Sequence, residues 1–319
     1  SALRESEGHM QQKKLSAPGS PRRIVIFKRE LHLYLMLIPG VAFALIFYYL
    51  PMFGLVMAFQ DFSPLRSFTG SEWVGLKNFQ SMLALPTFWT VVRNTLVIST
   101  IKIILRLLVP LILALLLNEV LNNAFKRTAQ TVFFLPYFLS WAVVGGVLRE
   151  LFEYDGMVNS ILQSMGMEPI MFLGSNTWFP IIVIVSDVWK DMGYNMIIFL
   201  AAITNVDPAL NESAALDGAT RWQQIWHITL PTIRPIVVML LVLALGSVLS
   251  AGQEQIMLLY NPMVYESSDI IDTLVYRTGL VNHQWSLSAA VGMMKSVISF
   301  LLVVISYRLA TKYFDYQVF

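Results

Sequence analysis

Long apolar runs dominate the chain from residue 33 onward. Three stretches contain no Asp, Glu, Lys or Arg, and they are Leu33–Gln60, Thr128–Leu148 and Pro235–Gln253. A helix needs roughly 20 mostly apolar residues to cross the hydrocarbon core of a bilayer. Each of these stretches therefore predicts a membrane-spanning helix.

Further stretches reach spanning length only if charged residues are included. They are Thr95–Leu117 with Lys102 and Arg106, Trp178–Ile203 with Asp187, Lys190 and Asp191, and Ser288–Tyr307 with Lys295. Together with the uncharged runs they predict an all-α membrane protein with six transmembrane helices.

Composition agrees with a membrane protein. Of the 319 residues, 56% are hydrophobic and 13% are charged, whereas about a quarter of a typical soluble domain is charged. We therefore expect the lipid bilayer to be a partner. A net charge of +2 without a basic stripe predicts no nucleic-acid partner. The chain has no cysteine and its four histidines show no paired spacing, so we expect no metal site and no cofactor bound by this chain.

Basic residues suggest the orientation in the membrane. Seven precede the first predicted helix: Arg4, Lys13, Lys14, Arg22, Arg23, Lys28 and Arg29. Because cytoplasmic segments are enriched in Lys and Arg, both termini are predicted to be cytoplasmic. Residues 1–30 are predicted to form a basic cytoplasmic tail without a cleavable signal, and residues 31–319 the transmembrane domain.

One polar segment, 207–231, lies between the fourth and fifth predicted helices. We call it the elbow. Asp207 suits a helix N-cap and Pro208 the first helical position. Gly218 can adopt the left-handed conformation that ends such a helix. The elbow is therefore predicted to begin with a short capped helix and a sharp turn.

A second short helix is predicted to follow the turn. Thr220 and Gln223 have the spacing of a capping box, and this helix is expected to end near Thr229, before Leu230-Pro231. Its outer face offers Trp222, Ile225 and Trp226 as apolar contacts. Two interpretations are open: docking into a groove of a partner protein, or packing at the membrane interface.

The elbow resembles the signature of bacterial binding-protein-dependent ABC importer permeases, which is Glu-Ala-Ala, three residues, Gly, nine residues and Ile-x-Leu-Pro. Here it consists of Glu212-Ser213-Ala214, Gly218 and Ile228-Thr229-Leu230-Pro231, with Ser213 replacing an alanine. The resemblance implies that the elbow is the coupling helix region, which seats in a cleft of an ATP-hydrolysing subunit. It assigns this coupling role to Glu212, Ala214, Ala215, Asp217, Gly218, Trp222, Ile228 and Pro231.

Other segments are similar to the oligosaccharide and polysaccharide branch of that family. They are WVGLKNF (73–79), FFLPYFLSW (133–141), YNPMVYESSDIIDTLVYRTGL (260–280) and SLSAAVGMMKSVISF (286–300). Within the branch, the likeness is to the first permease subunit of alginate importers. This implies the type I ABC importer permease fold in a bacterial cytoplasmic (inner) membrane.

The resemblance also implies an assembly. The sequence contains no Gly-x-x-x-x-Gly-Lys-Ser/Thr motif, so the chain is predicted not to be an ATPase itself. ATP and Mg would bind to two partner ATP-binding subunits. A second, homologous permease subunit would complete the path, and a periplasmic or extracellular solute-binding protein would deliver an oligo- or polysaccharide.

Charged residues inside spans usually face a cavity or one another. The predicted substrate path therefore comprises Asp187, Trp189, Lys190, Asp191, Tyr194, Asn195, Lys102, Arg106, Glu254 and Lys295, with Glu254 placed late in the fifth helix. The alternative is structural pairing, of Asp187 with Lys190 and of Glu254 with Lys295 or Lys102. Four basic against three acidic residues do not choose between a neutral and an anionic sugar.

Two other functions are compatible with the residues alone. An ion-coupled secondary transporter would use Asp187, Asp191 and Glu254 as proton or cation sites, although no internal repeat is apparent. A non-transporting membrane subunit would use the elbow only for docking. The first alternative predicts ion-coupled uptake by this chain alone, and the second predicts no substrate-stimulated ATP hydrolysis in the assembled complex.

Overall fold

The computed structural model describes residues 31–314, so the predicted basic tail at 1–30 lies outside the described residues. Within these residues the chain divides into two compact units, with the boundary between Gly54 and Leu55. In the first unit, α2 (Leu31–Ala44) continues into a π-helical turn, η1 (Leu45–Tyr49), and then into 3₁₀ helix η2 (Leu50–Phe59), which runs into the second unit. Pro51 lies where the helix type changes, because proline has no N–H to donate to the preceding turn.

The second unit begins with a small antiparallel strand pair. Strands β1 (Gln60–Asp61) and β2 (Glu72–Trp73) pair Gln60 with Trp73. The first helices of the unit are α3 (Ser67–Gly70), α4 (Lys77–Leu83), α5 (Phe88–Glu119), α6 (Asn123–Phe134), η3 (Leu135–Phe138), α7 (Trp141–Phe152), α8 (Met157–Ser164), η4 (Phe172–Gly174) and α9 (Trp178–Thr204).

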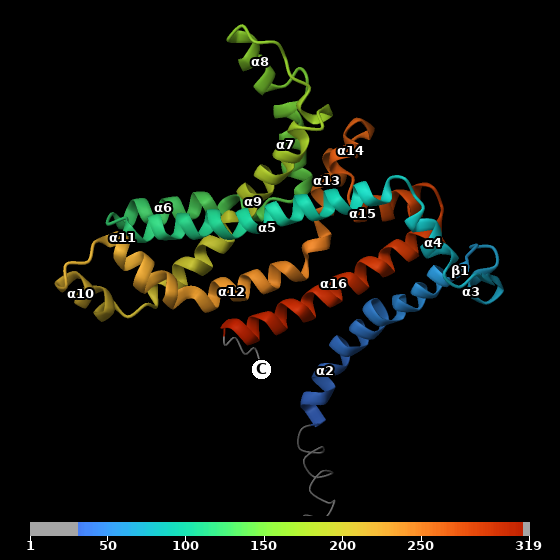
Figure 1. Ribbon diagram of the computed structural model, residues 1–319, viewed down its shortest axis with the longest axis horizontal. Helices are drawn as coiled ribbons and strands as arrows, with labels where there is room; N and C mark the ends of the chain where they lie inside the picture. The colour runs from blue at the N-terminus through green and yellow to red at the C-terminus, as the bar shows by residue number, and fades with distance from the viewer. Residues whose placement is uncertain (1–30, 315–319) are drawn as a thin grey trace, which may run out of the picture. The chain divides into compact units, whose positions relative to one another are not determined.

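The second half of this unit contains the elbow and the last helices. They are α10 (Pro208–Leu216), α11 (Arg221–Gln224), η5 (Ile225–Thr229), α12 (Leu230–Gly246), η6 (Val248–Ser250), α13 (Gln253–Leu259), η7 (Pro262–Val264), α14 (Tyr265–Ser268), α15 (Ile271–Tyr276), η8 (Arg277–Val281) and α16 (Trp285–Phe314). Helix α12 leads away from the elbow, and α16 returns beside it (Figure 1).

Four helices in the described chain are long and apolar enough to span a membrane: Leu33–Phe59, Phe88–Glu119, Arg221–Gly246 and Trp285–Leu309. The bent pair Asn123–Phe138 and Trp141–Ser164 makes a fifth if it counts as one span. Helix α9 has 27 residues but carries three charged side chains within five positions. The several apolar spans are confirmed, whereas the predicted count of six stays a prediction.

The prediction of one helix over Thr128–Leu148 is wrong. The chain bends by 99° between Phe138 and Trp141. Pro136 lies within η3, where it cannot donate a backbone hydrogen bond. Ser140 then caps a new helix, since its side chain accepts a hydrogen bond from the Val143 N–H.

The predicted helix ends around the elbow are also wrong. The helix that begins at Arg221 does not stop before Pro231 but continues to Gly246, and it does not reach Gln253. The backbone widens into a π-helical turn at Ile225–Thr229, just before Pro231, and so accommodates the missing proline N–H. The helix ends at Gly246, because Ser247 has the non-helical angles φ −108° and ψ 11°. Ala251 and Gly252 then have positive φ angles of 28° and 87°, which separate this helix from α13.

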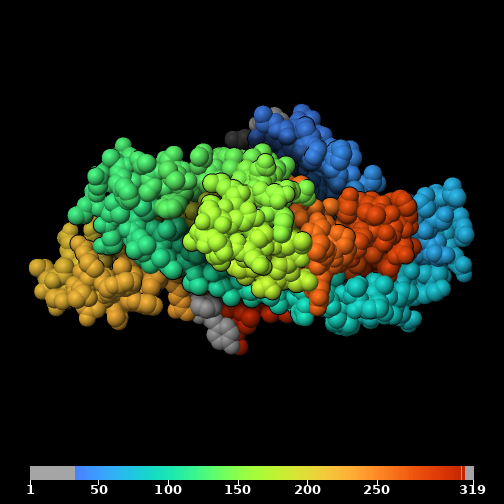
Figure 2. All heavy atoms as spheres, turned by 90° about the horizontal axis from the view of Figure 1, so that it is seen from above, coloured from blue at the N-terminus to red at the C-terminus, as the bar shows by residue number. Residues whose placement is uncertain are grey.

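Helices α5 and α9 form the centre of the second unit and lie side by side (Figure 1). Near the elbow their contact buries Ala114, Met196 and Phe199 completely. Helices α7 and α8 stand out from this pair (Figure 1) and cover the middle of the face that Figure 2 shows. The elbow lies at one end of the unit, and α4 with the strand pair lies at the other (Figure 1).

Candidate functional site

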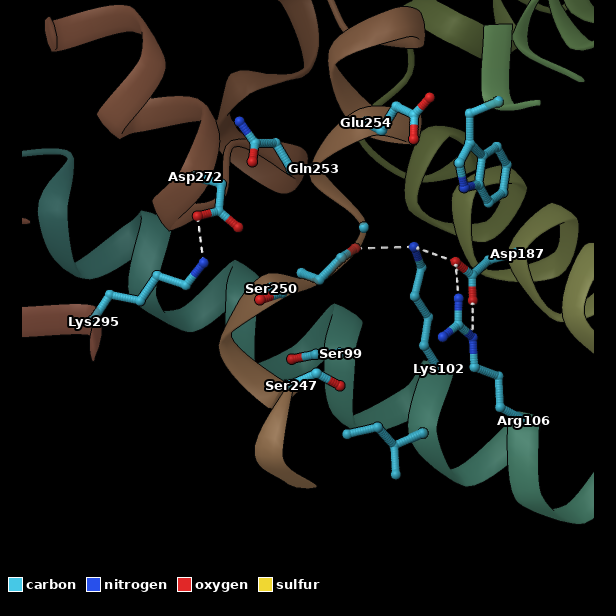
Figure 3. A pocket seen from close by; sticks show the side chains of 14 residues that line it. Ser99, Lys102, Arg106, Asp187, Ser247, Ser250, Gln253, Glu254, Asp272 and Lys295 are labelled. Carbon is cyan, nitrogen blue, oxygen red and sulfur yellow. Dashed lines mark hydrogen bonds and ion pairs between the residues drawn. The ribbon is translucent and has the colours of Figure 1, made fainter. Parts of the chain in front are cut away.

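A polar cavity of about 390 Å³ lies within the second unit (Figure 3). Its walls come from α5, α7, α9, α15, α16, the segment that joins α12 to α13, and the first turn of α13. The lining residues are Ser99, Lys102, Ile103, Arg106, Trp141, Asp187, Ser247, Ser250, Ala251, Gly252, Gln253, Glu254, Asp272 and Lys295. Among residues 31–314, no three His, Asp or Glu side chains are arranged to hold a metal ion.

The interruption between α12 and α13 shapes one wall of the cavity. Gly252 is left-handed, and a Cβ at this position would lie 2.7 Å from Lys102 Nζ, so both the backbone and the packing require glycine here. Irregular backbone at membrane depth is tolerated where it lines a cavity or is buried in protein. The broken helix therefore fits a role in forming a path.

Lys102 links the segment between α12 and α13 to the neighbouring helices. Its ammonium donates to Ala251 O at 3.0 Å and to Gln255 Oε1 at 2.7 Å, and lies 3.0 Å from Asp187 Oδ1. Gln255 in turn donates to Val183 O and Ser186 Oγ on α9, both at 2.8 Å. Lys102 is 4% exposed and Asp187 is fully buried. These two side chains are therefore fixed within the protein.

Arg106 joins the same network from one turn further along α5. Its Nε lies 2.6 Å from Asp187 Oδ2, and its Nη2 lies 2.8 Å from Asp187 Oδ1 and 2.6 Å from Asp191 Oδ2. The Arg106 side chain is 37% exposed, against 1% for Asp187. Arg106 is thus the most exposed charged side chain of this network, and Asp187 is the most buried.

Lys190 and Tyr194 support the network from the side. Lys190 Nζ lies 3.9 Å from Asp191 Oδ1, donates to Tyr137 O at 3.2 Å, and sits over the rings of Tyr137 and Trp141 at 5.5 and 5.4 Å. Tyr194 stacks on Tyr137 with ring centroids 4.9 Å apart. Cation–π contact stabilises such a buried ammonium. Neither residue lines the cavity.

Of the ten predicted path residues, the structure brings Lys102, Arg106, Asp187, Glu254 and Lys295 to the cavity. Asp191 and Asn195 do not line the cavity but contact Arg106. Asp191 pairs with the guanidinium, and the Asn195 side chain donates a hydrogen bond to Arg106 O at 3.2 Å. Trp189 lies elsewhere, along an apolar groove of about 500 Å³ between α7 and α9.

The structural pairings considered from the sequence do not form within residues 31–314. Asp187 binds Lys102 and Arg106 instead of Lys190, and Lys295 binds Asp272 instead of Glu254. Glu254 is exposed and has no ion pair in this range. It lies in the first turn of α13, so its placement late in the fifth helix is wrong.

Sequence reasoning missed Asp272 and the small residues of the interruption. Gly246 and Gly252, with Ser247 and Ser250 between them, interrupt an apolar run, and such a break is a pointer to a binding site in transporters. Asp272 has no comparable local signal, because its partner Lys295 is 23 residues away.

The elbow has the predicted local geometry. Asp207 Oδ1 accepts a hydrogen bond from the Ala209 N–H at 2.9 Å, and Gly218 has a φ angle of 83°. Thr220 and Gln223 form a complete capping box, in which each side chain binds the other residue's backbone N–H. Short-range chemistry therefore defines both helix starts and the turn between them.

The exposed surface of the elbow includes both apolar and polar side chains. Trp222 is 68% and Trp226 62% exposed. Of the predicted coupling residues, Glu212, Ala215, Asp217, Gly218, Trp222 and Pro231 are exposed, while Ala214 and Ile228 are half-buried. A pocket of about 420 Å³ lies between α10 and the α11–η5 segment. It is lined by Ala214, Asp217, Gly218, Ala219, Gln223, Gln224, His227 and Ile228. Arg221 Nε lies 3.9 Å from Glu119 Oε2, which connects the elbow to the end of α5.

Comparison with known proteins finds matches over nearly the whole chain. Residues 106–315 match the family model described as binding-protein-dependent transport system inner membrane component. The polygalacturonan/rhamnogalacturonan transport system permease protein YteP of Bacillus subtilis is 43% identical over 293 residues, which cover 92% of this chain and 91% of that protein. Protein LplB of Bacillus subtilis is 42% identical over 287 residues, or 90% of each chain.

Solved structures are similar as well. A chain in the crystal structure of a bacterial ABC transporter involved in the import of the acidic polysaccharide alginate has a TM-score of 0.86 and 37% identity, with 92% of this chain and 99% of that chain covered. A chain of a bacterial alginate ABC transporter in complex with alginate pentasaccharide-bound periplasmic protein has a TM-score of 0.86 and 36% identity, with 93% and 100% covered.

Proposed function

The chain belongs to the binding-protein-dependent transport system inner membrane component family, and we propose that it is the permease subunit of an ATP-driven importer for acidic oligo- or polysaccharides. It is a multi-pass membrane protein with several apolar helices. The observation that carries the proposal is the match over 92% of this chain and 99% of a chain from an alginate importer. The name of the similar protein YteP also refers to a saccharide.

The energy for transport would come from separate subunits. Because the sequence has no phosphate-binding Gly-x-x-x-x-Gly-Lys-Ser/Thr motif, ATP and Mg would be held by two partner ATP-binding subunits. The elbow suits contact with them, since both of its short helices are capped and it leaves Trp222 and Glu212 exposed. In this proposal the elbow, both termini and the ATPase subunits lie in the cytoplasm.

The cavity suits a path for a sugar. It combines charged groups, serine hydroxyls and an aromatic ring from Trp141 inside a unit whose helices are largely apolar. A second permease subunit would close the path, and α9 and the bent pair around Pro136 would complete six spans in the bacterial inner membrane. Two arrangements of these helices, one open to each side, would alternate as ATP binds and is hydrolysed.

A binding protein would supply the cargo from the outer side. One of the similar structures contains such a periplasmic protein with a bound alginate pentasaccharide. By analogy, a loaded binding protein would dock opposite the elbow, and its sugar would pass to the cavity. In this order the sugar would arrive on one side of the membrane, and the ATP-binding subunits would act on the elbow from the other side.

The proposal is tested by purifying the chain from its native membrane with an affinity tag and identifying its partners by mass spectrometry. We expect a second permease and an ATP-binding subunit, and ATP hydrolysis that rises when a uronate oligosaccharide and its binding protein are added. Uptake by the chain alone under an ion gradient would support a secondary transporter. An assembly whose ATP hydrolysis ignores every sugar would support a docking subunit.

A further inference from the structure

We propose that Arg106 recognises the carboxylate of the cargo, through its Nη1 nitrogen, and that the rest of the charge network holds it in position. This inference rests on the proposed transport of an acidic saccharide and assigns its recognition to one side chain. The sequence alone does not choose between a neutral and an anionic sugar. In the structure, the charged residues differ in how many of their hydrogen-bond donors already have a partner within the chain.

Arg106 keeps unused donors where the cavity is open. Its Nε and Nη2 bind Asp187 and Asp191, whereas Nη1 has no partner among the described residues. Figure 3 shows the remaining guanidinium nitrogen turned away from Asp187, and Arg106 is one of the residues that line the cavity. The side chain is 37% exposed. A carboxylate oxygen of a uronate would accept a charge-assisted hydrogen bond there.

The guanidinium is also held rigidly. Asp187 binds it through both carboxylate oxygens, and Asp187 is itself fixed by Lys102 at 3.0 Å. Asp191 binds the same guanidinium from a second direction at 2.6 Å. A donor that is fixed before the ligand arrives loses little conformational entropy on binding.

The other cations near the cavity are less available. Lys102 contacts three acceptors and is 4% exposed. Lys295 is balanced by Asp272, and its side chain is 19% exposed. Lys190 is 8% exposed and faces two aromatic rings. Around Arg106, three cations (Lys102, Arg106 and Lys190) face two carboxylates (Asp187 and Asp191), which leaves one positive charge in excess.

Glu254 gives the cavity the opposite polarity elsewhere on its wall. Its carboxylate is exposed, lines the cavity, and has no ion pair within residues 31–314. It can accept hydrogen bonds from sugar hydroxyls and repels a carboxylate. An acidic sugar is therefore expected to orient with its carboxylate toward Arg106 and its hydroxyls toward Glu254.

The first test compares two matched substrates, a uronate oligosaccharide and the same oligosaccharide with its carboxyl groups reduced to neutral hydroxymethyl groups. Each is added with its binding protein to the whole reconstituted complex. In Arg106→Lys the positive charge remains beside Asp187, but the Nη1 donors are lost. We expect the preference for the acidic substrate, measured as stimulation of ATP hydrolysis, to fall about tenfold or more.

The matched comparison is Glu254→Gln, an isosteric change in the same cavity, which removes the repulsion of a carboxylate and should raise the preference for the acidic substrate. An assembled, ATP-hydrolysing Arg106→Lys complex with the wild-type preference would overturn the inference. If the wild-type complex responds to neither substrate, the proposed function itself fails, and this outcome is distinct from the first.

A second measurement leaves Arg106 intact and omits the binding protein. Ile103 lies on the same helix, three positions before Arg106, and lines the cavity. The chain has no native cysteine, so Ile103→Cys provides a single labelling site. We expect the uronate oligosaccharide to slow reaction of this cysteine with a small neutral thiol reagent, and the reduced oligosaccharide to slow it much less. Equal protection by both, or by neither, would contradict recognition of the carboxylate by Arg106.

Discussion

The elbow and the charge network around Asp187 are both polar, but they are built in opposite ways. The elbow is made by residues close together in sequence, such as Thr220 and Gln223, and its outer side chains are exposed. The network joins residues 81 positions apart in Arg106 and Asp187, and 153 apart in Lys102 and Gln255. The elbow therefore leaves much of its surface exposed, whereas the network satisfies most of its charges within the chain.

This difference predicts where substitutions cause the greatest harm. Removing one member of a buried ion pair leaves its partner desolvated and uncompensated, whereas exposed groups contribute little to stability. Changes in the network should first reduce folding and assembly. Changes in the elbow should spare folding and reduce the link to ATP hydrolysis.

The largest effect is expected for Asp187→Asn. It removes the carboxylate that Lys102 and Arg106 share, and loss of such a buried partner costs about 3–5 kcal/mol. Thermal unfolding of the detergent-purified complex should show a clearly lower midpoint. The control Asp191→Asn changes a carboxylate that is 24% exposed and should lower the midpoint much less. Equal midpoints for the two variants would contradict the difference in burial.

The next effect concerns Gly218, whose φ is 83° and around which a Cβ would meet no atom within 4 Å. Only the backbone conformation therefore restricts this position. Gly218→Val should cost about 1–3 kcal/mol locally and abolish sugar-stimulated ATP hydrolysis while the chain still inserts. Gly218→Asn should retain most activity, because asparagine tolerates the left-handed region. Normal transport by an assembled Gly218→Val complex would rule out a coupling role for this turn.

A smaller effect is expected for Glu212, which is exposed on α10 and has no ion pair within residues 31–314. If it faces a basic group on the ATPase subunit, Glu212→Lys introduces repulsion and should weaken assembly, measured as the salt concentration at which the subunits separate. Glu212→Gln removes the attraction only and should weaken assembly less. Identical salt profiles for all three proteins would show that Glu212 does not face the partner.

The smallest effect is expected for Thr220→Ala, which removes one half of the capping box. Loss of such a cap costs about 1 kcal/mol and acts on the first turn of α11. Hydrogen exchange at the Gln223 amide should speed up, while Thr220→Ser should preserve protection. Unchanged exchange in the alanine variant would mean that the surrounding helix, rather than the cap, determines the stability of this turn.

The elbow shows what sequence can predict. The caps of α10 and α11 and the left-handed Gly218 are recognisable because each interaction spans three residues or fewer. The helix end before Pro231 was not predictable in the same way. The π-helical turn at Ile225–Thr229 absorbs the proline, and such a turn has no simple pattern.

The network shows where sequence reasoning stops. The charged positions themselves were evident, because Lys102, Arg106 and Asp187 interrupt apolar runs. Their partners were not, since pairing depends on how α5 packs against α9 and against the break near Gly252. Pro136 permits a kink within a span, but the size of the bend after it is not predictable, because proline does not set the angle between the two helices.

We propose that ATP hydrolysis by separate subunits, transmitted through residues 207–231, drives sugar through this chain. The most direct measurement is uptake of a labelled uronate oligosaccharide into proteoliposomes that contain the whole complex, with and without ATP, for the wild type and Gly218→Val. We expect the wild type to take up the sugar only when ATP is present. We expect no uptake by the assembled Gly218→Val complex, with or without ATP. Uptake without ATP under an ion gradient, or equal ATP-dependent uptake by both proteins, would contradict the proposal.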